Sequence, residues 1–125
     1  MSKKLYSLTN PQKSIWLTEQ FYKGTSIENI TGSVMLSQNV DFDALKKAIN
    51  LFVKKNDSFR LKFTVENGTV MQYIEPFAEF DIEIVEVSSD KDIKNWESEH
   101  LSYLSTVPEV FDVLHYVTIL DLKKK

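Results

Sequence analysis

The stretch that decides the fold is DFDALKKAINLFVKKNDSFRLKF, residues Asp41–Phe63. Its apolar residues recur with the spacing of one helical face, which predicts an amphipathic helix; they are Leu45, Ala48, Ile49, Phe52 and Val53. The polar residues between them are expected to stay in water; they are Lys46, Lys47, Asn50, Lys54 and Lys55. Either Asp41 or Asp43 can cap the N-terminus, and the lysines suit the C-terminal end of the helix dipole.

A strand follows this helix almost at once. The polar stretch 56–58 (NDS) ends the helix. Phe59, Leu61 and Phe63 then alternate with charged residues, which is the pattern of a strand with one apolar face. Because so short a break separates the two elements, we expect the helix to pack back onto a sheet.

The segment before this stretch carries a second helix signal. Capping residues precede Pro11, which suits a first helical turn, and the helix is expected from about Pro11 to Tyr22. Its apolar residues fall on two sides, so we expect a core helix buried on both. The alternative is functional: Gln12 and Glu19 line a cleft.

The remaining elements complete a mixed α/β pattern. Asn67-Gly68 predicts a tight hairpin because both positions tolerate positive φ. Strands are expected at 30–36, 59–63, 70–74, 80–87 and 113–122, and a third helix, capped by residues 88–90, at 91–104. The order is α β α β β β α β. We therefore expect one α/β (α+β) sandwich over residues 1–125, in which helices cover a mixed, partly antiparallel sheet.

Composition excludes several classes of protein. The 125 residues are 42% hydrophobic and 26% charged, with a net charge of −3 and no basic patch, so nucleic acid is an unexpected partner. Without cysteine there is no disulfide or thiolate chemistry, and three glycines leave no phosphate-binding loop. No apolar run approaches the ~18 residues of a membrane span, and the N-terminus lacks a signal peptide core. We expect a cytoplasmic protein with no membrane partner.

The residues alone do not assemble an active site. His100 and His115 have no second histidine or cysteine at metal-ligand spacing, so no metal site is expected. No G-x-S-x-G elbow is present, and the carboxylates are scattered over solvated faces. His100 lies on an apolar helical face, where a packed histidine is commoner than a catalytic base.

Two stretches nevertheless resemble the first two core motifs of nonribosomal peptide synthetase condensation domains. LTNPQKSIWL (8–17) resembles the first motif, with its glutamine and its aromatic-containing end. KNDSFRLKF (55–63) resembles the second, R-H-E-x-L-R-T-x-F. Arg60 and Phe63 match it directly, Asp57 and Phe59 are conservative replacements, and Asn56 stands where the motif has histidine. Residues 15–30 (IWLTEQFYKGTSIENI) carry a finer similarity to the first condensation domain of surfactin-type lipopeptide synthetases.

The resemblance implies a fold and an activity. Condensation domains resemble chloramphenicol acetyltransferase: two lobes enclose a tunnel for two phosphopantetheine arms carried by partner carrier proteins. A donor acyl or peptidyl thioester is attacked there by the amine of an acceptor aminoacyl thioester, and an amide forms. The domain itself binds no cofactor directly. The whole chain resembles the N-terminal lobe of such a domain.

One family feature is absent from the sequence. Condensation domains use a His-His-x-x-x-Asp-Gly motif, and this chain has no adjacent histidines. We therefore expect an incomplete N-terminal lobe, inactive alone, with no catalytic residue of its own. By resemblance, Gln12 and Trp16 line the tunnel wall, and Arg60 anchors the lobe with Asp57 and Phe63 as motif residues. The alternative for Gln12 and Trp16 is plain packing in the core or at its boundary. The alternative for Arg60 is a solvent-exposed arginine on a strand.

Two other functions stay open at this point. The chain could be a stand-alone module that binds a carrier protein or an acyl group, or a small acyltransferase that uses His100 or His115. A half-fold also leaves apolar sheet edges uncovered, and such edges favour pairing with another chain. We therefore expect a homo-oligomer at high concentration.

Overall fold

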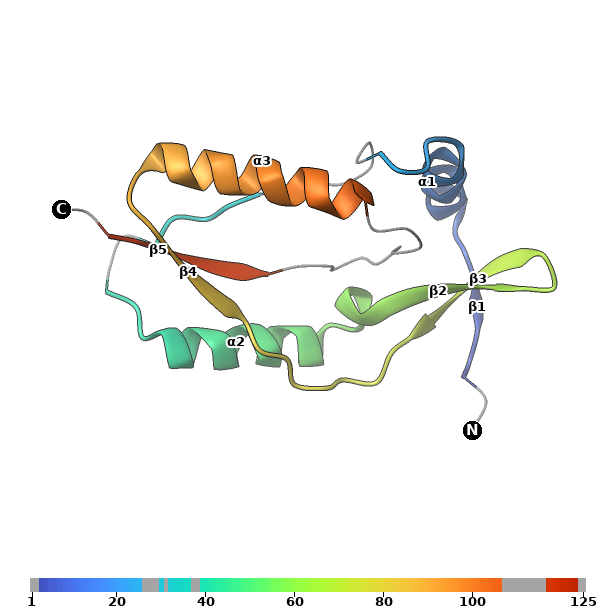
Figure 1. Cartoon of the computed structure of the whole chain (residues 1–125). Helices are drawn as coiled ribbons and strands as arrows, with labels where there is room; N and C mark the ends of the chain where they lie inside the picture. The colour runs from blue at the N-terminus through green and yellow to red at the C-terminus, as the bar shows by residue number, and fades with distance from the viewer. Residues whose placement is uncertain (1–2, 26–29, 31, 37–38, 107–116, 124–125) are drawn as a thin grey trace. The chain divides into compact units, whose positions relative to one another are not determined.

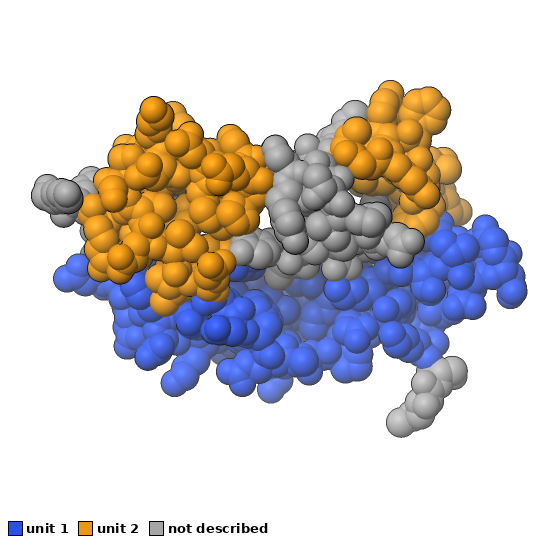
Figure 2. All heavy atoms as spheres, in the orientation of Figure 1, with its two compact units in different colours: residues 1–9, 35–82, 111–117 blue, residues 10–34, 83–110, 118–125 orange. Residues whose placement is uncertain are grey.

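The computed structural model describes residues 3–25, 30, 32–36, 39–106 and 117–123 (Figure 1). The chain divides into two compact units (Figure 2). Unit 1 comprises residues 1–9, 35–82 and 111–117, and unit 2 comprises residues 10–34, 83–110 and 118–125. The chain crosses between the units several times. The expectation of a single domain over residues 1–125 stays a prediction.

Unit 1 is built on a three-stranded antiparallel sheet. Its strands are β1 (Tyr6–Ser7), β2 (Leu61–Glu66) and β3 (Thr69–Ile74), in the order β1-β3-β2. Asn67 and Gly68 join β2 to β3 with φ angles of 52° and 79°. Both angles lie in the left-handed region that a tight hairpin turn requires, so the predicted hairpin is confirmed.

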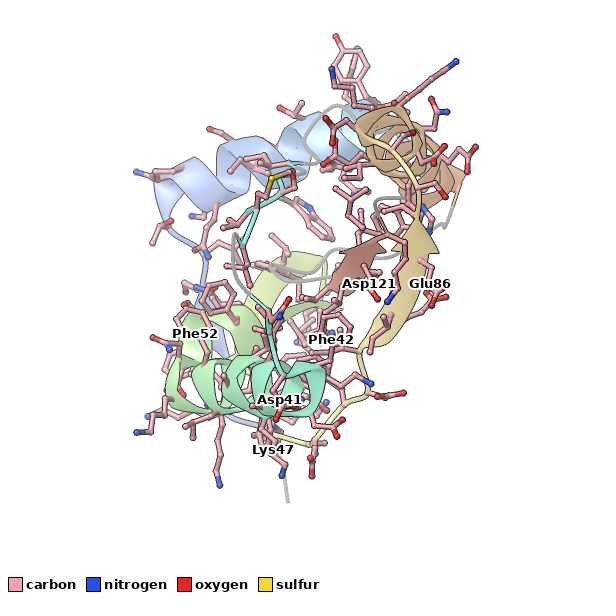
Figure 3. All side chains as sticks on the ribbon, turned by 90° about the vertical axis from the view of Figure 1, so that its left-hand side faces the viewer. Asp41, Phe42, Lys47, Phe52, Glu86 and Asp121 are labelled. Atoms are coloured by element: carbon pink, nitrogen blue, oxygen red, sulfur yellow. The ribbon has the colours of Figure 1, made fainter. Side chains whose placement is uncertain are left out.

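The helix predicted in the opening stretch is also present. It is α2 (Phe42–Lys55), and Asp41 caps it by accepting a hydrogen bond of 3.1 Å from the backbone N–H of Ala44 (Figure 3). The next residues depart from the prediction. The segment Asp57–Arg60 forms a 3₁₀ turn, η1, and the strand starts only at Leu61. This turn brings the Arg60 side chain back to the end of α2.

The burial of two residues on α2 differs from the prediction. Asn50, expected in water, is 7% exposed, whereas Phe52, expected in the core, is 54% exposed. The reason is a polar pairing that periodicity does not report: the Asn50 amide binds the backbone of Phe80, 30 residues further along the chain. The buried face of α2 is therefore turned toward Asn50 and Val53.

Unit 2 contains a strand–helix–strand unit and one further helix, α1 (Asn10–Phe21). Strands β4 (Glu83–Val87) and β5 (Thr118–Leu122) pair in parallel, with Glu86 opposite Asp121 (Figure 3). Their connection holds α3 (Asp90–Thr106), which lies beside the pair (Figure 1). At its start the Ser89 hydroxyl accepts from the N–H of Asp92, as the predicted cap requires.

The fold class is confirmed, whereas the arrangement of strands differs from the expected one. Among the described residues, the antiparallel and parallel pairs lie in two sheets, whereas one mixed sheet was expected. A strand was expected at 30–36; the described residues of this segment, 30 and 32–36, have no regular structure. The last strand was expected from Val113; residues 113–116 lie outside the described part, and β5 runs from Thr118. Strand formation needs a pairing edge, which an alternating sequence alone does not supply.

The core of the described residues is small. Its buried apolar side chains are Leu8, Val53, Ile82, Val87 and Ile119. The expectation that α1 is a core helix is wrong, because no residue of α1 is buried. Leu17 and Phe21 are 66% and 80% exposed. The apolar pattern of α1 thus specifies a helix but not a covered one.

Candidate functional site

The guanidinium group of Arg60, in the second motif, binds four other residues. Its Nε donates to the carbonyl of Val53 at 3.2 Å, its Nη1 to that of Glu75 at 2.9 Å and its Nη2 to that of Lys54 at 3.2 Å. Nη2 also forms an ion pair with the Asp57 carboxylate. We call these five residues the Arg60 cluster. The Arg60 side chain is only 15% exposed, which excludes the alternative of a solvated strand arginine.

The chain geometry explains why arginine suits this position. The last carbonyls of an α-helix have no partner within the helix and carry the negative end of its dipole. Arg60 supplies donors to two of them, at Val53 and Lys54, and reaches the residue after β3 with its other nitrogen. Its own carbonyl accepts from the N–H of Glu75 at 2.9 Å. The cluster therefore ties the end of α2 to the end of the hairpin.

Phe63, the other direct match to the second motif, lies on β2 next to this cluster in sequence. It is half-buried and faces Gln72 of β3 in the sheet register. Gln72 is buried and donates to the carbonyl of Ser7 at 2.9 Å, which holds β1 on β3. Phe63 thus belongs to the sheet of unit 1. Its role in a reaction stays a prediction.

Gln12 and Trp16 lie one turn apart on α1, and both are half-buried. They belong to unit 2, whereas Asp57, Arg60 and Phe63 belong to unit 1. The five predicted residues therefore fall into two groups, each described within its own unit. That Gln12 and Trp16 line a tunnel stays a prediction.

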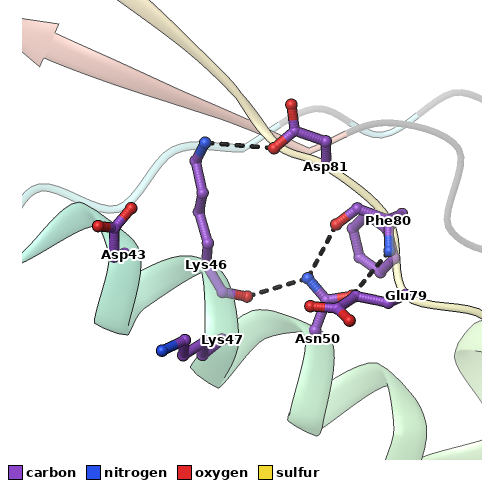
Figure 4. Close-up of a pocket in the computed structure, with 7 residues that line it drawn as sticks. All are labelled: Asp43, Lys46, Lys47, Asn50, Glu79, Phe80 and Asp81. Atoms are coloured by element: carbon purple, nitrogen blue, oxygen red, sulfur yellow. Dashed lines mark hydrogen bonds and ion pairs between the residues drawn. The ribbon is translucent and has the colours of Figure 1, made fainter.

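A pocket that the sequence did not indicate lies on α2 (Figure 4). It has a volume of about 310 Å³ and is open to solvent. Its lining residues are Asp43, Lys46, Lys47, Asn50, Glu79, Phe80 and Asp81. The Asn50 amide donates to the carbonyls of Phe80 and Lys46, both at 3.0 Å, and accepts from the N–H of Phe80 at 3.0 Å. This two-way pairing fastens segment 79–82 to the helix as a neighbouring strand would.

One ion pair lies at the rim of this pocket. Lys46 Nζ lies 3.2 Å from a carboxylate oxygen of Asp81, which is 91% exposed. The hydrogen bond from Lys46, and a second from the Ile82 backbone, hold the pKa of Asp81 below its ordinary value. The resulting stabilisation is present above the ordinary carboxyl pKa and is lost as the pH falls through the lowered one. An exposed pair of this kind contributes little to folding.

Two lysines at the ends of the described chain show the opposite shift. A hydrogen bond to Tyr73, aided by Glu75 at 3.5 Å, raises the pKa of Lys3. A hydrogen bond to Asp121 at 2.9 Å raises the pKa of Lys123. Both contacts favour the charged lysine, so they stabilise the fold at neutral pH and are lost as the pH rises through the raised values. They fasten terminal segments and form no reaction centre.

The described histidine, His100, packs within α3. His100 stacks on Trp96 with ring centroids 3.7 Å apart, and its Nδ1 lies 2.9 Å from the Trp96 carbonyl. This is the packed helical histidine that the sequence predicts. His115 lies outside the described residues. Within the described part of the chain, no group of three potential metal ligands comes together, and no helix has the length and apolarity to cross a membrane.

Comparison with known proteins agrees with the two motifs. The family described as "Condensation domain" matches residues 2–108, which is most of the chain. The chain belongs to the condensation domain family. Surfactin synthase subunit 1 of Bacillus subtilis (strain 168) is 36% identical over 101 residues, and a plipastatin synthase of the same strain is 29% identical over 107 residues. These matches cover 75% and 82% of this chain but only 3% and 4% of the two synthases.

A solved structure shares the fold. The starter condensation domain of rhizomide synthetase RzmA superposes with a TM-score of 0.64 over 96% of this chain at 18% identity. The match covers 30% of that chain. At this identity the likeness supports the fold alone. Together, the comparisons match this chain to the N-terminal part of a condensation domain.

Proposed function

We propose that this chain serves as the N-terminal subdomain of a condensation domain that joins two carrier-bound thioesters through an amide bond. The observation that carries the proposal is the family match over residues 2–108. The Arg60 cluster supports it, because Arg60, which matches the second motif directly, binds carbonyls at the end of α2 and after the hairpin. A cytoplasmic location belongs to the same proposal.

The reaction proposed for the intact domain is acyl transfer. The acceptor's amine nitrogen attacks the carbonyl carbon of the donor thioester; the C–N bond forms, the C–S bond breaks and the amine proton ends on the departing thiol. Each thioester is carried by the 4′-phosphopantetheine arm of a carrier protein. Within this chain, Arg60 acts as a positioning residue. Because the chain has no adjacent histidine pair, we propose that it does not catalyse this step alone.

An amide-forming assay with loaded carrier proteins tests this proposal. The chain is compared alone and as part of the condensation domain of its parent synthetase. We expect product only from the larger protein. In that protein, Arg60→Ala should lower turnover and Arg60→Lys should restore part of it, whereas Lys94→Ala, at an exposed position outside both motifs, should change nothing. Turnover by the chain alone would overturn the proposal, and substitution of His100 and His115 would then show whether either histidine acts.

Titration with a carrier protein distinguishes the proposed subdomain from the alternative, a stand-alone binding module. A subdomain should bind a phosphopantetheinylated carrier protein only weakly, because the second wall of its tunnel belongs to another part of the domain. Saturable, tight binding by the chain alone would favour the module. The same titration with an acyl-loaded carrier protein distinguishes recognition of the acyl group from recognition of the protein.

We further propose that the isolated chain associates with a second copy of itself. Large apolar side chains are exposed in both units; besides Leu17 and Phe21 they include Leu51, Phe52, Val65, Ile30, Val34 and Met35. Sedimentation equilibrium over a wide concentration range tests this. We expect the apparent mass to rise with concentration and to fall when Leu17 and Phe21 are both replaced by glutamine. A monomeric mass at millimolar concentration would contradict self-association while leaving the proposed reaction untouched.

A further inference from the structure

We draw no further inference here: the strongest candidate, the exposed face of α2 on which Lys47, Lys54 and Lys55 lie one turn from the half-exposed Leu51, is an unpartnered surface, and nothing in the structure shows what covers it.

Discussion

Helices α1 and α2 differ in how far their sequence patterns determine their surroundings. Both follow capping residues in the sequence, but the apolar residues of α2 recur on one helical face whereas those of α1 fall on two sides. On α2, Val53 and Asn50 are buried and the last carbonyls are bound by Arg60. On α1, no side chain is buried. One partner of α2, Arg60, follows it closely in the chain, whereas the other, Phe80, lies 30 residues beyond Asn50. Helix α2 thus has partners within its own unit that cap and cover it, and among the described residues no such cover is formed on α1.

The Arg60 cluster gives the largest expected effect. Replacing Arg60 by alanine removes a donor from three backbone carbonyls; Val53 keeps the Asn56 N–H, whereas Lys54 and Glu75 lose the side-chain donor described here, and a carbonyl is costly to leave unpaired. We expect the free energy of unfolding to fall by about 3 kcal/mol, measured by urea denaturation. Arg60→Lys should recover less than half, because a single ammonium cannot span three carbonyls as the guanidinium fork does.

Lys55→Ala is the matched control for this prediction. It removes a neighbouring cation at the same helix end, and its exposed side chain has no described contact with the Arg60 cluster. Its effect should stay within about 0.5 kcal/mol. A loss below 1 kcal/mol for Arg60→Ala would show that the cluster does not hold α2 on the hairpin, and the contrast between the two helices would weaken.

Asn50 tests the second anchor of α2. In Asn50→Ala the backbone N–H and carbonyl of Phe80 lose this partner in a partly buried setting. We expect a loss of about 2 kcal/mol in urea denaturation. The control is Asn95→Ala on an exposed position of α3, which should be neutral or slightly stabilising because alanine favours helix. Equal effects at the two asparagines would mean that the Phe80 pairing does not contribute.

These residues also show what the sequence could and could not predict. Helix α2, its acidic cap and the Asn67-Gly68 hairpin depend on chain neighbours, and all were predicted, although the sequence left Asp41 and Asp43 as equal candidates for the cap. The burial of Asn50 depends on Phe80, 30 residues away, and periodicity alone placed it in water. The strand expected at 30–36 failed for the same reason, since its pairing edge is not a local property.

The candidate site was likewise predicted only in part. Arg60 and Asp57 were singled out by resemblance to a family motif. They lie three residues apart in the sequence, and in the structure they form an ion pair. The resemblance did not indicate that Arg60 binds the carbonyls of α2, because backbone acceptors leave no mark on the sequence. The pocket on α2 was missed altogether. Its lining joins residues 43–50 to residues 79–81, and no motif links the two segments.

The hairpin turn offers a smaller, purely local test. Gly68 has a φ of 79°, which an L-residue with a Cβ adopts only at a cost. Gly68→Ala should therefore lower the unfolding free energy by about 1 kcal/mol in thermal or urea denaturation. Gly32→Ala is the control: Gly32 lies outside the left-handed region and has no atom within 4 Å of the added Cβ. At Gly32 the substitution should be neutral or slightly stabilising, because alanine lowers the entropy of the unfolded chain. If both substitutions lowered stability equally, the positive φ of the turn would not be the cause of the loss.

The smallest expected effect lies on α1 and bears most directly on the comparison. Leu17→Gln and Phe21→Gln replace side chains that are already in water, so each should change the unfolding free energy of a dilute sample by less than about 0.5 kcal/mol. Val53→Ala on α2 should cost about 2 kcal/mol, because it opens a cavity beside a buried helix face. If the α1 substitutions cost as much as Val53→Ala at every protein concentration, α1 is covered within one chain and the two helices do not differ. If they cost stability only at high concentration, a second copy covers α1, and its apolar pattern is then explained by association.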